Sequence, residues 1–167
     1  MLEKRRALLL ACLAWPATRL AAMEVPAALR RWGSGEFRRF GFLVDEATLW
    51  AGDDPQRPPL VLRLDYKRNI AGTAIAEASV KEMRRTVADE ARLRAWGERM
   101  AQIFPDVKPG DHIVGHYLPE GALFMQGERE LGRIDDPDFA RAFFGIWLDP
   151  RTSAPGLRAA LLRQTGA

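Results

Sequence analysis

The chain has 167 residues, 47% of them hydrophobic and 28% charged. This length is enough for one ordinary domain with a buried core. Its formal net charge is +3, but residues 1–22 hold four of the 25 Lys and Arg residues and one of the 22 Asp and Glu residues, so 21 of each remain after residue 22. A basic chain would favour nucleic acid or an anionic surface as a partner, and the even balance after residue 22 removes support for either.

The first 22 residues are predicted to be a secretory signal peptide. A basic triplet at residues 4–6 precedes a short apolar stretch at residues 7–14, and residues 20–22 offer small side chains for cleavage. The apolar stretch is far shorter than the roughly 20 residues that a membrane-spanning helix needs, and no later stretch approaches that length. We therefore expect an exported, periplasmic protein without a transmembrane segment, with a single domain over residues 23–167.

The only cysteine, Cys12, lies in this leader. Two interpretations stay open: an apolar residue of the signal segment, or the acylation site of a lipoprotein with residues 9–12 as its motif. In both cases the rest of the chain has no disulfide, no cysteine nucleophile and no cysteine metal ligand.

The first half of the chain contains predicted strands followed by predicted helices. Apolar alternation predicts one or two strands over residues 37–51 and another over residues 60–66. A helix is predicted over residues 72–86, and Asp89 is placed to cap the next one. The second helix should bury one stripe, made of Leu93, Trp96, Met100 and Ile103.

The second half repeats this order. Residues 111–118, 122–126 and 130–134 are predicted to form three strands of a β-meander. Strands, helices, strands and helices in this succession indicate an α+β domain, in which one mainly antiparallel sheet carries helices on a face.

The two closing helices have distinct start and stop signals. Asp136 is placed to N-cap the first, with Pro137 in its first turn, and the residues before Pro150 should end it. Thr152 or Ser153 is expected to cap the last helix.

Several segments, taken in order, resemble the chalcone isomerase-like family in its bacterial exported branch, over nearly all of the chain after the leader. They are residues 33–35, 42–44, 47–50, 64–70 (LDYKRNI), 80–85, 103–111 (IFPDVKPGD) and 143–153 (FFGIWLDPRTS). The resemblance implies a curved, mainly antiparallel sheet with helices layered on one face, and a cleft between sheet and helices. It also implies one of three roles, because the family includes enzymes that close a chalcone into a flavanone, fatty-acid-binding relatives and proteins with no assigned reaction.

The residues of the enzymes are only partly present here. The family's arginine on an early strand falls at Arg38 or Arg39, whereas its threonine position falls within residues 42–44, where there is no hydroxyl. Its tyrosine and asparagine positions are also changed, and Tyr66 and Thr73 are the nearby candidates. The cation is kept and the donors for a developing enolate are lost. A further departure is Asp45, where bacterial relatives usually have tyrosine.

The resulting hypothesis is a non-catalytic binding domain for a fatty acid or a similar apolar carboxylate, with Arg38, Arg39, Tyr66 and Thr73 as candidate ligand-binding residues. An isomerase of the chalcone isomerase type (an intramolecular lyase) and a partner-interaction scaffold remain alternatives. An inward arginine could equally form a structural ion pair with Asp45 or Asp65, and Tyr66 could simply pack in the core.

We expect no cofactor and no metal. His112 and His116 lie on one strand, separated along it by roughly 13 Å, which is too far to chelate one ion without bending the strand.

Overall fold

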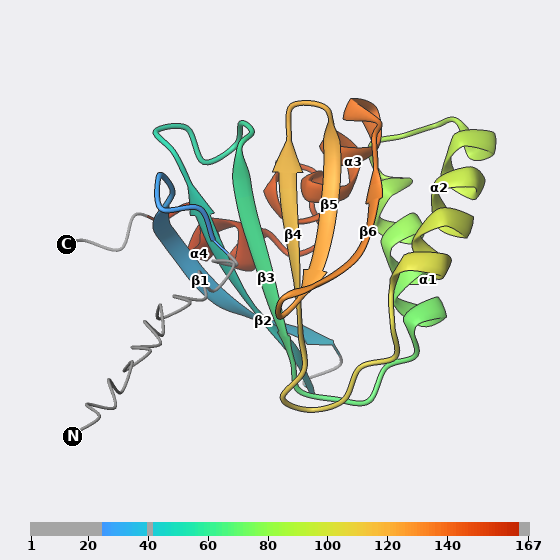
Figure 1. The fold of residues 1–167 in the computed structure, drawn as a ribbon, viewed down its shortest axis with the longest axis horizontal. Coiled ribbons are helices and arrows are strands. Elements are labelled where there is room, and N and C mark those ends of the chain that lie inside the picture. Colours follow the sequence, from blue (N-terminus) through green and yellow to red (C-terminus); the bar gives the residue numbers. More distant parts are fainter. Residues whose placement is uncertain (1–24, 40–41, 164–167) are drawn as a thin grey trace, which may run out of the picture.

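The computed structural model describes residues 25–39 and 42–163, without the side chains of residues 39, 42 and 43. Six strands form one antiparallel sheet in the order of the sequence, with every neighbouring pair antiparallel (Figure 1). The strands are β1 (Arg30–Arg39), β2 (Phe42–Ala51), β3 (Leu60–Tyr66), β4 (His112–Leu118), β5 (Gly121–Gln126) and β6 (Arg129–Ile134). The predicted signal peptide and Cys12 lie outside the described residues.

The described part of the chain also contains four helices, which confirm the predicted α+β class. They are α1 (Gly72–Met83), α2 (Glu90–Ile103), α3 (Pro137–Leu148) and α4 (Pro155–Leu161). Helix α3 packs on β4 and β5, and α4 packs on β1 and β2. Helix α1 packs against both α2 and α3 (Figure 1). None of the helices in the described ranges is long and apolar enough to cross a membrane.

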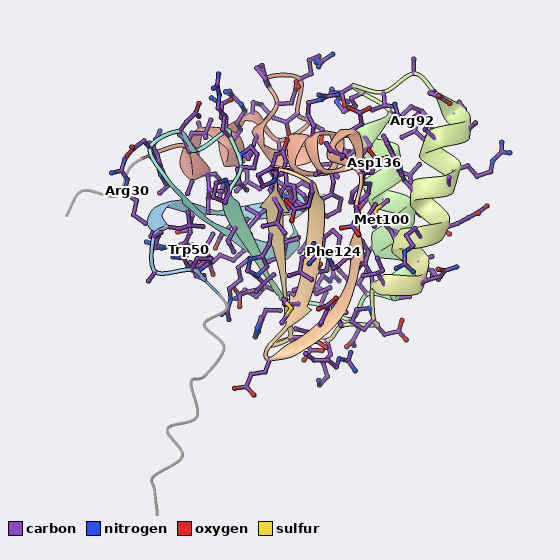
Figure 2. The ribbon with its side chains drawn as sticks, turned by 45° about the horizontal axis from the view of Figure 1, so that its top comes forward. Arg30, Trp50, Arg92, Met100, Phe124 and Asp136 are labelled. Carbon is purple, nitrogen blue, oxygen red and sulfur yellow. The ribbon has the colours of Figure 1, made fainter. Side chains whose placement is uncertain are left out.

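Capping by aspartate starts two of these helices where the sequence predicts. The Asp89 side chain accepts hydrogen bonds from the backbone N–H groups of Ala91 and Arg92, and Asp136 does the same for Asp138 and Phe139. Helix α2 buries the predicted stripe of Leu93, Trp96, Met100 and Ile103. Met100 of α2 and Phe124 of β5, both labelled in Figure 2, are fully buried.

The start of α4 differs from the prediction. Its N-cap is Ala154, which provides no side-chain hydrogen bond, and Pro155 follows. Proline has no N–H group, so one donor of the first turn needs no partner. Thr152 instead closes the connection from α3, because its hydroxyl donates to the Ile146 carbonyl at 2.6 Å and accepts from the Ala154 N–H at 3.1 Å.

Strand β1 begins seven residues earlier than the predicted strand at residue 37. The segment contains Gly33 and Gly35, which interrupt apolar alternation, and α4 packs against it. A Cβ atom at Gly33 would lie 2.1 Å from the Ala160 carbonyl oxygen, so the glycine permits the close approach of helix and strand.

Candidate functional site

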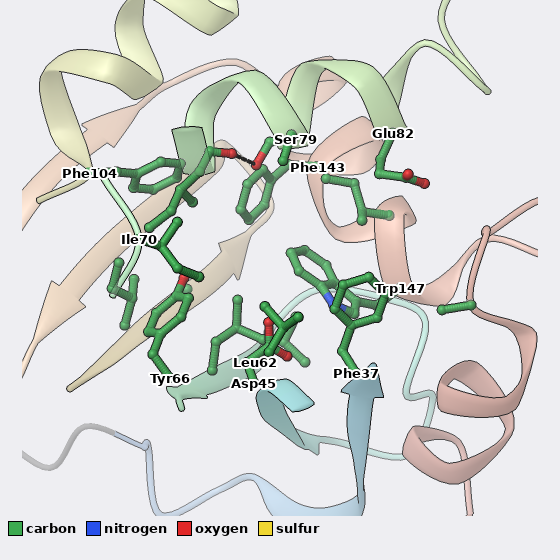
Figure 3. Close-up of a pocket in the computed structure, with 18 of the residues that line it drawn as sticks. Phe37, Asp45, Leu62, Tyr66, Ile70, Ser79, Glu82, Phe104, Phe143 and Trp147 are labelled. Carbon is green, nitrogen blue, oxygen red and sulfur yellow. Dashed lines mark hydrogen bonds between the residues drawn. The ribbon is translucent and has the colours of Figure 1, made fainter. Parts of the chain in front are cut away.

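A cavity of about 540 Å³ lies between the inner face of the sheet, α1 and α3 (Figure 3). This volume is within the range of roughly 300–1,000 Å³ that small-molecule sites occupy. Its walls are mainly apolar and include Leu62, Ile70, Phe104, Phe124, Phe143 and Trp147.

Small side chains on α1 leave this space open. Ala74, Ala78 and Ser79 line the cavity from the helix and are too short to fill it. The helix itself is fixed at its start, where the Gly72 N–H donates to the Asp106 carboxylate at 2.8 Å. A Cβ atom at Gly72 would lie 2.0 Å from the Phe104 carbonyl oxygen, so only glycine lets the helix begin this close to the end of α2.

Asp45 and Tyr66 provide polar groups inside the cavity. They face each other directly in the register of β2 and β3 and both line the cavity (Figure 3). Their exposed fractions are 7% and 3%. Asp45 Oδ1 is the one buried side-chain nitrogen or oxygen without a hydrogen-bond partner in the part of the chain that the structure describes.

Burial determines the ionisation of both groups. Removal from water raises the pKa of Asp45 to about 7, because a charged carboxylate is disfavoured in apolar surroundings. Burial, and secondarily the nearby Asp45, also raises the pKa of Tyr66. The tyrosine therefore stays a neutral hydroxyl, and Asp45 is divided between its two protonation states near neutral pH.

The mouth of the cavity carries charged side chains. Arg38, Lys81 and Glu82 line it, and the Glu82 carboxylate accepts a hydrogen bond from the Ser153 hydroxyl at 2.6 Å. The Arg38 side chain is 53% exposed and donates to the Glu36 carboxylate at 2.7 and 3.0 Å. The register of β1 and β2 shifts between Phe37, which pairs with Asp45, and Arg38, which pairs with Leu43, so that Val44 of β2 is an extra residue. Phe37 and Arg38 both line the cavity at this irregularity.

The predicted ligand-binding residues have different placements. Arg38 and Tyr66 line one cavity, the first at its mouth and the second inside. Thr73 is exposed on α1 and is not among the lining residues, because the helix turns Ala74 and Ala78 toward the cavity instead. The side chain of Arg39 lies outside the described part of the chain.

The ion-pair partner of Arg38 differs from the two aspartates that the sequence suggested. Arg38 pairs with Glu36, and not with Asp45 or Asp65, and Asp65 pairs with Arg63 at 2.8 Å. The Ser79 hydroxyl, which lies in the cavity wall, donates to the Ile75 carbonyl at 2.8 Å within its own helix. Because the Ser79 and Ser153 hydroxyls already donate hydrogen bonds within the protein, the Tyr66 hydroxyl is the one in the described lining that can donate to a ligand inside the cavity.

Asp45 is the functional candidate that sequence reasoning did not include among the site residues. The signal for it is the series Asp45, Ala47 and Leu49, alternate positions of β2 that are all buried. A carboxylate in the buried phase of a strand indicates a special environment.

No group of three or more His, Cys, Asp or Glu side chains that could hold a metal occurs among residues 25–39 and 42–163. His112 lies opposite Asp65 on β3, and His116 lies opposite Val61.

An antiparallel sheet with helices on one face and an apolar cavity between them defines an α+β protein built around an internal site. Its sequence places it further: the model of the chalcone isomerase-like family matches residues 46–163, and the chain belongs to that family.

Two similar proteins give this assignment its context. An uncharacterized protein of Haemophilus influenzae is 28% identical over 134 residues, which cover 80% of this chain and 64% of that relative. The chain therefore spans less than two thirds of the length of the curated relative that it matches. The crystal structure of a fatty-acid binding protein of Arabidopsis thaliana superposes with a TM-score of 0.61, at 11% identity over 83% of this chain and 88% of the other. This likeness concerns the fold.

Proposed function

We propose that this protein is an exported, non-catalytic domain that binds a fatty acid or a similar apolar carboxylate in the cavity between α1, α3 and the sheet. The observation that carries the proposal is the apolar cavity of about 540 Å³ whose mouth has cationic side chains. The fatty-acid binding described for the structurally similar Arabidopsis protein supports it.

The alkyl chain of the ligand provides most of the affinity. Each methylene group buried against the aromatic and aliphatic walls contributes about 0.8 kcal/mol. Part of this gain offsets the loss of translational and conformational freedom of the ligand. A long, flexible acyl chain therefore binds more tightly than a short one until the cavity is full.

The head group lies at the mouth, near Arg38 and Lys81. Both cations are in contact with water, so each adds at most about 1 kcal/mol to the affinity for a carboxylate. Their main effect is on orientation, because they favour the ligand pose with its head outside and its tail inside.

The isomerase alternative has less support from the site. Cyclisation of a chalcone proceeds through a phenolate and a developing enolate, and both carry negative charge. The Asp45 carboxyl lies beside Tyr66 in the cavity, and its ionised form would destabilise an anion there. The scaffold alternative predicts a filled core, whereas the core contains this cavity.

Export is part of the proposal and concerns residues 1–22. The basic start, apolar stretch and small residues support cleavage by a signal peptidase and a mature domain from residue 23. The intact mass of the protein recovered from a periplasmic fraction tests this. A mass that retains the first 22 residues would contradict it.

Calorimetric titration with hexadecanoic acid tests the binding. We expect saturable binding to the wild-type protein and its loss in Ala78→Trp, which places a large ring in the cavity from an exposed helix position. Ala101→Trp is the matched control, because Ala101 is an exposed alanine of α2 that does not line the cavity. Absence of binding to wild type, or binding that Ala78→Trp leaves intact, would overturn the proposal.

A further inference from the structure

An alkyl chain in this cavity leaves the Asp45 carboxyl without a partner. The side chain is 7% exposed, and its Oδ1 atom forms no hydrogen bond with the described protein atoms. A buried polar group without a hydrogen bond is costly to a folded protein. Its presence on the wall of the cavity therefore points to a ligand group that pairs with it.

The charged groups around the cavity do not provide that pair. Arg38 on β1 forms its ion pair with Glu36, while Lys81 and Glu82 on α1 line the mouth. Tyr66 on β3 faces Asp45 across the strand register, but no hydrogen bond joins the two side chains. Figure 3 shows both side chains projecting from neighbouring strands into the same space.

Hydrogen-bonding chemistry restricts which ligand group fits Asp45. An ionised carboxylate only accepts hydrogen bonds, whereas its protonated form also donates one. Because burial raises the pKa of Asp45 to about 7, both forms are present near neutral pH. A ligand hydroxyl can donate to the first form and accept from the second. A ligand carboxylate fits only the protonated form, and a methylene group fits neither.

We propose that the ligand of this cavity is a hydroxylated fatty acid, whose chain hydroxyl hydrogen-bonds Asp45 while its carboxylate lies at the mouth near Arg38. This inference rests on the proposed function and specifies its ligand. The Tyr66 hydroxyl, on the neighbouring strand, can provide a second hydrogen bond to the same group.

The experiment compares hexadecanoic acid with a series of hydroxyhexadecanoic acids that differ in the carbon carrying the hydroxyl. We expect at least one isomer to bind the wild-type protein about tenfold more tightly than the plain acid, as for one hydrogen bond to a charged group. In Asp45→Leu, which removes the partner, the advantage should fall below about twofold. Asp45→Asn keeps an acceptor and a donor and should retain a preference.

A matched control is Glu46→Leu, which changes the next residue of β2 and does not touch the cavity lining. It should leave the preference for the hydroxylated acid unchanged. Thermal unfolding monitored by circular dichroism identifies a variant that does not fold. If Asp45→Leu does not fold, Asp45→Ala provides the comparison, because it also removes the hydrogen-bonding group and should lose the preference.

The outcomes separate the two proposals. Equal affinity for all acids, or a preference that survives in Asp45→Leu, overturns the role of Asp45 and leaves fatty-acid binding intact. No binding of any acid overturns both.

Discussion

The indole nitrogen of Trp96 donates a hydrogen bond to the Asp136 carboxylate at 3.0 Å, across 40 residues of sequence. The second oxygen of the same carboxylate caps α3 by accepting from the backbone N–H groups of Asp138 and Phe139. Arg92 of α2 also lies near this carboxylate (Figure 2), with its Nη2 atom 3.8 Å from Asp136 Oδ2. One side chain thus starts α3 and attaches it to α2.

Asp136→Ala should therefore destabilise the protein by about 1–3 kcal/mol, since it removes a helix cap and leaves the buried indole N–H without a partner. Urea unfolding measures the change. The control is Asp135→Ala, which removes an exposed carboxylate paired with Arg133 and should cost less than about 0.5 kcal/mol. Equal losses for the two variants would contradict this role of Asp136.

Gly33→Ala should destabilise the domain by about 2 kcal/mol or more, because the new methyl group would overlap the backbone of α4 at Ala160. The measurement is the midpoint of thermal unfolding. Gly52→Ala, with no atom within 4 Å of the added Cβ, serves as its control and should change little. A neutral Gly33→Ala variant would mean that α4 does not pack closely on β1.

Asp45 should give the protein an unusual pH dependence. Its pKa is 3.8 when unfolded and about 7 when folded, so the native state holds an extra proton between these values. Stability from this group is present in full below about pH 4 and is lost as the pH rises to about 7, by up to roughly 4 kcal/mol. Above about pH 7 it changes no further.

Asp45→Asn should remove this loss, so that the variant gains stability relative to wild type as the pH increases from about 4 to 7. Comparing the two proteins cancels the titration of the other carboxylates. Urea unfolding at a series of pH values measures the difference. A difference that is constant across the series would show that Asp45 titrates normally.

Glu36→Gln should strengthen the binding of an apolar carboxylate about twofold to threefold at low salt, because it releases Arg38 from its ion pair at the cavity mouth. High salt should reduce the gain by screening an exposed charge. Titration calorimetry at two ionic strengths checks both statements. If affinity does not change at low salt, Arg38 does not contact the head group.

Local sequence signals predicted much of the fold. The caps at Asp89 and Asp136 and the stripe of α2 act within a few residues of the chain, and the structure contains them. The start of β1 was not predictable in this way, because Gly33 serves a contact with α4, more than 120 residues later. The beginning of α4 depends likewise on its proline and on the Thr152 hydroxyl contact to α3.

The site was predicted only in part, because it also depends on contacts between segments that are far apart in the sequence. The placement of Arg38 depends on a register shift between β1 and β2 that strict alternation does not include. Asp45 gains its significance from the absence of a nearby partner, and only the packing of α1 and α3 over β2 and β3 determines that. Thr73 has a suitable hydroxyl but lies outside the cavity lining.

Photo-crosslinking with a fatty acid that carries a diazirine on its chain, followed by peptide mass spectrometry, tests most directly whether the cavity holds the ligand. The predicted result is saturable labelling of cavity residues such as Ile70, Phe143 and Trp147, which an excess of unlabelled acid abolishes. Labelling confined to residues outside the cavity, or labelling that an excess of unlabelled acid does not reduce, would contradict the account.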